Sequence, residues 1–126
     1  MGVQFNHTIV WCMDKVQTAT FLAGILGRPE PTQFGPFRVI ELDNGVSLDF
    51  HETKGKIASQ HYAFLIDAER FDSVLARICA RGLTYWADPG RSQANEINHN
   101  AGGRGFYFAD PNGHLLEVMT RPYGSD

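Results

Sequence analysis

The sequence predicts an α+β fold of two βαβββ modules, in which a curved mixed sheet carries its helices on the outside. The main observation is an internal repeat: Asn-Gly-Val-Ser-Leu-Asp-Phe at 44–50 and Asn-Gly-His-Leu-Leu-Glu-Val at 112–118 are each a turn followed by a strand. Each half also begins with a histidine-bearing strand, and apolar residues at helical spacing follow it. The chain should therefore form the same unit twice.

The first module is predicted over about 1–52. Its helix should begin after Asp14, a good N-cap residue, and end at Gly27. The turn before its last strand is Asp43-Asn44-Gly45, because Asn-Gly tolerates the positive φ angles of tight hairpins. Residues rich in Phe, Ile, Val and Trp predict the strands. These strands are residues 4–12, 31–34, 37–42 and 46–51.

The second module repeats this order over about 59–120, after a polar linker at 53–59. Helix 68–81 carries its apolar residues on one face and is followed by Gly82. A long polar loop at 88–104 is the main difference between the halves, and such loops are usually functional lids or disordered. The predicted strands are residues 60–66, 83–87, 105–109 and 114–120, with a frayed tail at 121–126.

Composition excludes several classes of protein. A chain of 126 residues with 43% apolar and 20% charged residues predicts one globular domain, residues 1–126. A net charge of −3 favours neither a nucleic-acid partner nor an anionic membrane, and no apolar run is long enough to span a bilayer. We find no signal-peptide pattern, and two cysteines fit a reducing compartment. We therefore expect a cytoplasmic protein.

The alternation of side chains along a strand decides which residues share a face. His7 shares its face with Phe5, Ile9 and Trp11. Asp49 points away from Val46, Leu48 and Phe50, the apolar set of its strand that must cover the helix. Each candidate ligand should thus lie on the face opposite the helix, among mostly apolar neighbours. This arrangement predicts a largely apolar cavity.

Four side chains of the repeat should enter this cavity: His7, Asp49, His61 and Glu117. A carboxylate in an apolar cavity is costly unless a cation or a hydrogen-bond donor pairs with it. Imidazole and carboxylate groups suit Zn, Ni, Mn, Fe or Co. The sequence therefore predicts a divalent-metal site. The other two histidines of the strands, His51 and His114, are expected to be exposed.

Three segments resemble the vicinal oxygen chelate superfamily: Phe-Asn-His-Thr near the start, Gln-His-Tyr-Ala-Phe near the middle, and Gly-Phe-Tyr-Phe-Ala-Asp-Pro-Asn-Gly-His-Leu-Leu-Glu-Val near the end. This superfamily includes glyoxalase I, extradiol dioxygenases, fosfomycin-resistance transferases and bleomycin-binding proteins. The resemblance implies one metal ion per chain, with His7, His61 and Glu117 as ligands and Asp49 at the fourth, variable position. It also implies a homodimer, in which pairing closes the sheets.

The sequence departs from particular members of the superfamily. Glyoxalase I-like enzymes bind glutathione through an arginine and an asparagine, at positions that hold Trp11 and Thr53 here. Fosfomycin transferases have a threonine where this chain has Ile9, and a lysine-bearing potassium loop, whereas 88–104 contains no lysine. We therefore expect that glutathione plays no part.

The predicted function is that of a metal-dependent enzyme acting on a small, oxygenated and partly apolar substrate that chelates the metal. Lyase, isomerase and ring-cleaving dioxygenase reactions all fit this description. Glu117 or Asp49 could act as the general base, and Tyr107 is expected to point toward the substrate. The alternative is a drug-binding resistance protein of the bleomycin-binding type. The expected substrate-binding residues are Phe5, Ile9, Trp11, Arg104, Tyr107 and Met119.

Overall fold

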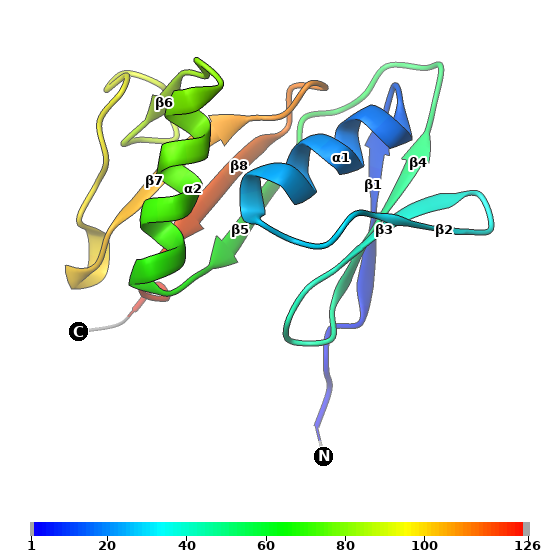
Figure 1. Ribbon diagram of the computed structural model, residues 1–126, viewed down its shortest axis with the longest axis horizontal. Helices are drawn as coiled ribbons and strands as arrows, with labels where there is room; N and C mark the ends of the chain where they lie inside the picture. The colour runs from blue at the N-terminus through cyan, green and yellow to red at the C-terminus, as the bar shows by residue number, and fades with distance from the viewer. Residues whose placement is uncertain (1, 125–126) are drawn as a thin grey trace. The chain divides into compact units, whose positions relative to one another are not determined.

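A computed structural model describes residues 2–124 of the chain. It divides into two compact units, Met1–Ile57 and Ala58–Asp126, and the boundary lies within the predicted linker (Figure 1). Each unit is a strand, a helix and three further strands, which confirms the two predicted βαβββ modules. Among the described residues, none of the helices has both the length and the apolar character needed to cross a membrane.

Unit 1 contains a four-stranded mixed sheet with strand order β1-β4-β3-β2. The first strand pairs with β4 in parallel, and the other neighbours are antiparallel. Helix α1 contacts β3 and β4, so it covers one face of this sheet. The elements are β1 His7–Cys12, α1 Lys15–Leu26, β2 Thr32–Phe34, β3 Phe37–Glu41 and β4 Ser47–Glu52.

Local signals in the sequence define the ends of α1. The Asp14 side chain accepts a hydrogen bond from the Gln17 backbone N–H, as an N-cap residue does. Gly27 ends the helix with a φ of 73°, in the left-handed region that glycine adopts without strain. Both predicted helix ends are therefore confirmed.

Unit 2 contains a second four-stranded mixed sheet with the equivalent order β5-β8-β7-β6. Again the first strand pairs in parallel with the last, and the other pairs are antiparallel. Asp67 caps the start of the helix, and Gly82 follows its end with a φ of 66°. The elements are β5 His61–Leu65, α2 Ala68–Ala80, β6 Tyr85–Trp86, the short 3-10 helix η1 Asn100–Gly102, β7 Gly105–Ala109 and β8 Leu115–Met119.

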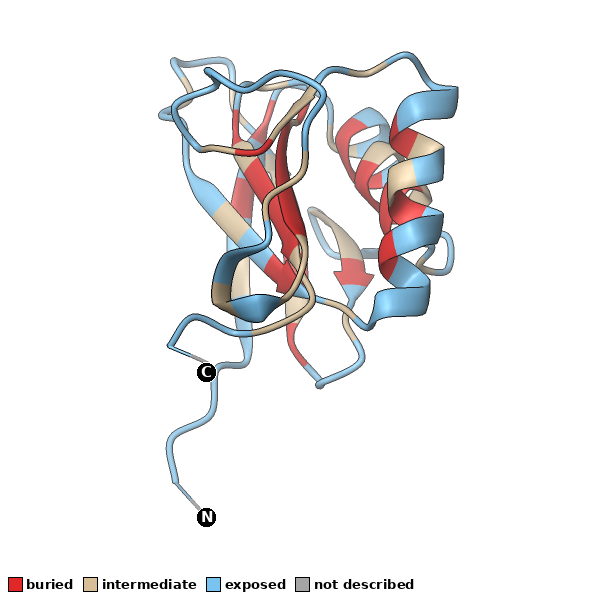
Figure 2. Cartoon of the chain, turned by 90° about the vertical axis from the view of Figure 1, so that its left-hand side faces the viewer, coloured by how far each residue is buried: buried red, intermediate tan, exposed pale blue. Residues whose placement is uncertain are grey.

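Buried residues line the helix side of each sheet (Figure 2). In unit 1, Leu48 and Phe50 are buried on β4, as the alternation of this strand predicts. In unit 2, the Phe71 ring of α2 meets the Phe106 ring of β7 edge-on, with 5.4 Å between centroids. The predicted ligands lie on the opposite face of each sheet.

The prediction that His114 is exposed was wrong. His114 is only 1% exposed. Its Nδ1 atom accepts a hydrogen bond from the Gln60 backbone N–H at 3.0 Å, and its ring packs edge-on against the Tyr62 ring. The Asp110 carboxylate accepts the His114 backbone N–H at 2.8 Å, and this bond draws the turn tightly onto the sheet. A turn residue can thus enter the core when its ring satisfies a backbone donor.

The long loop 88–104 has internal hydrogen bonds that give it a defined path. The Asp88 carboxylate accepts the backbone N–H groups of Ser92 and Gln93. The Asn98 side-chain amide donates to the Ala87 carbonyl at 2.9 Å, and Asn98 bridges to Gly105. The loop therefore carries structure of its own within unit 2.

Candidate metal centre

The centre of unit 2 is a pair of side chains on neighbouring parallel strands. In the β5–β8 register, His61 lies opposite Leu115 and Glu117 lies opposite Ala63, so both side chains project from the face away from α2. The His61 Nε2 atom is 3.1 Å from Glu117 Oε1. The parallel pairing places both groups on the same face of neighbouring strands, within contact distance.

The other nitrogen of His61 fixes the orientation of its ring. Nδ1 is 2.9 Å from the Leu115 carbonyl oxygen, and a carbonyl can only accept, so Nδ1 carries the proton. In a neutral ring, Nε2 then presents a lone pair to the Glu117 carboxylate. Two facing acceptors need a proton or a cation between them. A histidine held by a backbone carbonyl is also the usual arrangement of a metal ligand.

Glu117 is buried, at 1% exposure, and tyrosine hydroxyls satisfy part of the hydrogen-bonding capacity of its carboxylate. The Tyr123 hydroxyl lies 2.9 Å from Oε1 and 3.0 Å from Oε2. The Tyr107 hydroxyl lies 3.3 Å from that of Tyr123. Burial, and next the hydrogen bond with Tyr123, raises the pKa of Tyr107, so its phenol stays a neutral hydrogen-bonding group at neutral pH.

Unit 1 holds the repeat-related pair, His7 and Asp49, in the same register. His7 lies opposite Ser47, and Asp49 lies opposite Ile9. Here each group has a local partner: His7 Nδ1 is 2.7 Å from the Asn6 side-chain oxygen, and Asp49 accepts the Ser47 hydroxyl at 2.9 Å. The two ligand candidates therefore line a common surface, and each is bonded to a neighbour on its own segment.

That surface is a cavity of about 460 Å³ within unit 1. His7 and Asp49 line it together with Phe34 and Phe37. Most of its other lining residues are polar, and the predicted contacts Phe5, Ile9 and Trp11 do not line it. The cavity is therefore more polar than the largely apolar one that the strand alternation predicts. A cavity of this size is in the range that holds a small molecule.

The His61–Glu117 pair fits a divalent cation. An imidazole nitrogen and a carboxylate oxygen are both ligands that such a cation accepts. The Nε2 and Oε1 atoms lie 3.1 Å apart, which is also the length of a hydrogen bond between them. Across residues 2–124, no three His, Cys, Asp or Glu side chains converge, so the structure does not gather three of the predicted ligands within either unit. His7 and Asp49 lie in unit 1, and His61 and Glu117 lie in unit 2.

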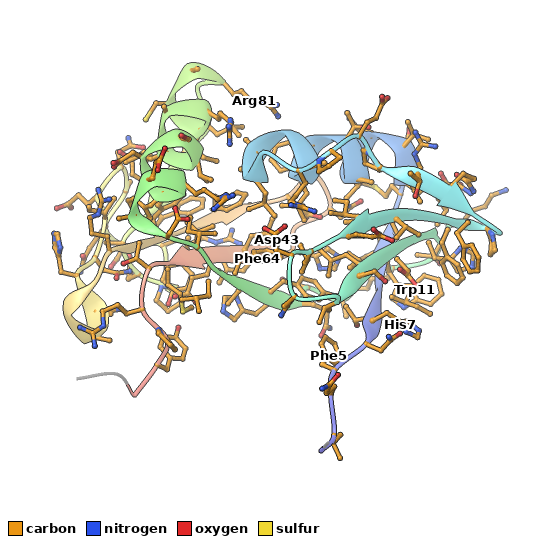
Figure 3. The ribbon with its side chains drawn as sticks, turned by 60° about the horizontal axis from the view of Figure 1, so that its bottom comes forward. Phe5, His7, Trp11, Asp43, Phe64 and Arg81 are labelled. Carbon is orange, nitrogen blue, oxygen red and sulfur yellow. The ribbon has the colours of Figure 1, made fainter. Side chains whose placement is uncertain are left out.

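The predicted apolar contacts lie beside the ligands on their strands. Figure 3 shows His7 and Trp11 on the same side of β1, whereas Phe5 lies before the strand begins. Phe5, Ile9 and Trp11 are exposed apolar residues, and Trp11 is 44% exposed. Met119, half-buried, follows Glu117 by two residues on β8 and so shares its face.

Arg104 has a different setting. Its guanidinium donates to the Asp72 carboxylate at 2.8 Å and to the Ala68 carbonyl at 3.1 Å, both on α2. It also lies over the Phe71 ring, 4.4 Å from the centroid. These contacts hold Arg104 against the helix, on the other side of the sheet from Glu117.

Two residues near the ligands were missed in the sequence. Tyr123 belongs to the tail predicted to be frayed, and no periodic signal reaches beyond the last strand. His51, predicted to be exposed, is half-buried between Trp11 and Phe37, with ring centroids 5.1 and 5.2 Å away. Its Nδ1 is buried, and among the described residues it has no hydrogen-bond partner. The strand register, which pairs Trp11 with His51, could have revealed this cluster.

Several known proteins are similar to this chain. The solved structure of the oxidase ChaP-H2 is 57% identical, covers 99% of this chain and 98% of its own, and superposes with a TM-score of 0.96. The glutathione transferase FosA of Serratia marcescens is 27% identical over 119 residues, which are 90% of this chain and 77% of FosA.

A further structure supports the fold alone. A glyoxalase/dioxygenase from Nostoc punctiforme is 20% identical, with a TM-score of 0.70 over 94% of this chain and 91% of its own. No family model matches the chain. The repeated strand register and these relatives together show that the chain belongs to the vicinal oxygen chelate superfamily.

Proposed function

We propose that the chain is a metal-dependent enzyme acting on a small, oxygenated and partly apolar substrate that chelates the metal through two neighbouring oxygens. The observation that carries this proposal is the His61–Glu117 pair, in which an imidazole nitrogen lies 3.1 Å from a buried carboxylate oxygen. One relative is named an oxidase and another a glutathione transferase, and both names support an enzymatic role.

The proposed centre binds one divalent cation per chain. His7, His61 and Glu117 are its ligands, and Asp49 takes the fourth, variable position. Such a cation, when bound, stabilises negative charge that develops on a substrate oxygen. The metal is one of Zn, Ni, Mn, Fe or Co, which the imidazole and carboxylate donors suit.

The residues of the chain have distinct roles in this proposal. The Leu115 carbonyl orients His61, and the buried position of Glu117 keeps its carboxylate away from water. Glu117 or Asp49 takes a proton from the substrate as general base. The Tyr107 hydroxyl, which reaches the Tyr123 hydroxyl, donates a hydrogen bond to a substrate oxygen. The high pKa of Tyr107 keeps that proton in place.

The apolar side chains favour an aromatic substrate over a highly charged one. Phe5, Ile9, Trp11 and Met119 are the proposed contacts, and Phe34 and Phe37 line the cavity in unit 1. The ion pair and the ring contact with α2 already engage Arg104, so the proposed site does not include it.

The relatives favour one of the three candidate reactions. ChaP-H2 is named an oxidase, and its 57% identity favours a reaction that uses oxygen over lyase and isomerase chemistry. Of the three candidates only the dioxygenase reaction uses oxygen, and we propose Fe(II) as its metal. FosA is named a glutathione transferase, but Trp11 and Thr53 stand where glyoxalase-type glutathione contacts are expected. We therefore keep the proposal that glutathione is not a substrate.

An assay with each metal tests the proposal. The protein is loaded in turn with Zn, Ni, Mn and Fe(II), and then offered either a catechol with oxygen or glutathione with methylglyoxal. We expect ring cleavage by the Fe(II) form only, and loss of this activity in His61→Ala. Efficient turnover of glutathione and methylglyoxal would contradict the proposal, as would tight binding of an aromatic drug without metal or turnover.

We also propose that the chain is a homodimer. The two sheets leave β1, β2, β5 and β6 at their edges, and Trp11 and Phe34 are exposed on edge strands. Pairing of two copies would cover such edges. Sedimentation at micromolar concentration should give twice the mass of one chain, and a monomer with bound metal would contradict this.

A further inference from the structure

We propose that Tyr123, in the segment after the last strand, is a positioning residue that fixes the Glu117 carboxylate for cation binding. This inference rests on the metal centre of the proposed function and adds a residue to it. Its basis is that the Tyr123 hydroxyl lies within hydrogen-bond distance of both Glu117 oxygens, at 2.9 and 3.0 Å.

The Tyr123 hydroxyl makes the hydrogen bonds to Glu117, and the residue as a whole is mostly exposed. Tyr123 is 65% exposed, whereas Glu117 is 1% exposed. A mostly exposed ring contributes little apolar burial. The hydroxyl alone connects this segment to the carboxylate, with the Tyr107 hydroxyl 3.3 Å away as the next group. The substitution of Tyr123 by phenylalanine therefore removes a single, defined interaction.

A hydroxyl in this place can orient a ligating carboxylate. A phenol has one proton to donate, and a carboxylate has room for about four acceptor contacts. With the phenol proton on Oε2, Oε1 stays directed at His61 Nε2, 3.1 Å away. The terminal torsion of a glutamate is broad, so without the phenol the two oxygens can rotate away from this geometry.

Unit 1 supports the same interpretation. Its carboxylate, Asp49, also accepts a hydroxyl hydrogen bond, from Ser47 at 2.9 Å. Ser47 lies two residues before Asp49 on the same strand, whereas Tyr123 reaches Glu117 from beyond β8. Both carboxylates of the repeat thus have a hydroxyl donor, supplied by different parts of the chain.

The test measures Co(II) affinity by competition with a coloured chelator, together with the visible absorption of bound Co(II). Tyr123→Phe should bind Co(II) about 10- to 100-fold more weakly, the usual effect of losing a partner of a ligand. The Co(II) absorption should also change, because the carboxylate turns. A chain that ends at Arg121 should show the same loss.

The matched control is Tyr85→Phe, which removes a phenolic hydroxyl near Cys79 of α2, far from the ligand face. It should leave Co(II) affinity and absorption unchanged. Affinity of Tyr123→Phe within twofold of wild type, or tighter, would overturn the inference. If wild type does not bind Co(II), or if His61→Ala binds it as well as wild type, the proposed metal centre is wrong. If His61→Ala abolishes Co(II) binding but Tyr123→Phe leaves it unchanged, only the role of Tyr123 is wrong.

Discussion

The two units place a histidine and a carboxylate in the same register, yet the two pairs differ in the contacts that their side chains make. His61 and Glu117 are in direct contact, and Glu117 is buried. His7 and Asp49 each bind a neighbour on their own segment instead. The duplicated backbone therefore determines where the groups lie, and other residues determine how they interact.

The residues beside each carboxylate account for much of this difference. Glu117 is flanked by Ala63 on β5 and Tyr107 on β7. The equivalent neighbours of Asp49 are Ile9 on β1 and Val39 on β3. A small alanine and a long glutamate allow the contact with the histidine, whereas a bulky isoleucine and a short aspartate do not favour it.

The largest expected effect separates the two carboxylates. Glu117→Gln should weaken divalent-cation binding by more than about 100-fold, because losing a ligand weakens binding more than losing a residue that orients a ligand. Asp49→Asn should weaken binding by about tenfold, since Asp49 is at the variable position. Isothermal titration with Zn(II) measures both. Equal losses in the two variants would show that the pairs are equivalent and break the comparison.

The turn before each last strand offers a second contrast, in stability. His114 stands at the position that Val46 has in unit 1, and both follow an Asn-Gly turn. His114→Val should lower the free energy of unfolding by about 1–3 kcal/mol, because the Gln60 N–H loses its acceptor. Urea denaturation measures this change, and the exposed His99→Val is the control. A cost as small as that of the control would show that this hydrogen bond does not matter.

An exchange of neighbours tests the packing explanation directly. Ala63→Ile gives β5 the residue that β1 has at the equivalent position and should crowd the His61–Glu117 pair. Because residue 63 is exposed, stability should change little, but cation affinity should fall by about tenfold. Unchanged affinity in competition titrations would mean that side-chain length, and not the neighbour, sets the contact.

The smallest effect concerns the loop that unit 1 lacks. The Ser92 hydroxyl, and then the backbone N–H groups of Gln93 and Ser92, hold the pKa of Asp88 below its usual 3.8. A lowered pKa contributes stability above the usual value, and this stability is lost as the pH falls through the native pKa. Thermal unfolding followed from about pH 6 to about pH 2 should therefore be less pH-dependent in Asp88→Asn. An identical pH profile in the two proteins would contradict this role.

The sequence was sufficient for the features that repeat. The Asn-Gly turns, the Asp14 cap and the equivalent positions of Asp49 and Glu117 predicted both units and the sheet face on which these two carboxylates lie. These signals are local or periodic, so one sequence contains them. Tyr123 and His114 were missed because their roles depend on long-range hydrogen bonds, to Glu117 and Gln60, which no spacing encodes.

The metal content of the protein tests the central claim most directly. Wild type, His7→Ala and His61→Ala are purified without chelators, and first-row metals are measured by mass spectrometry, with His99→Ala as the matched control. The proposal predicts about one metal ion per chain in wild type and His99→Ala, and its loss in both ligand variants without unfolding. Unchanged metal content in both His7→Ala and His61→Ala would contradict the account.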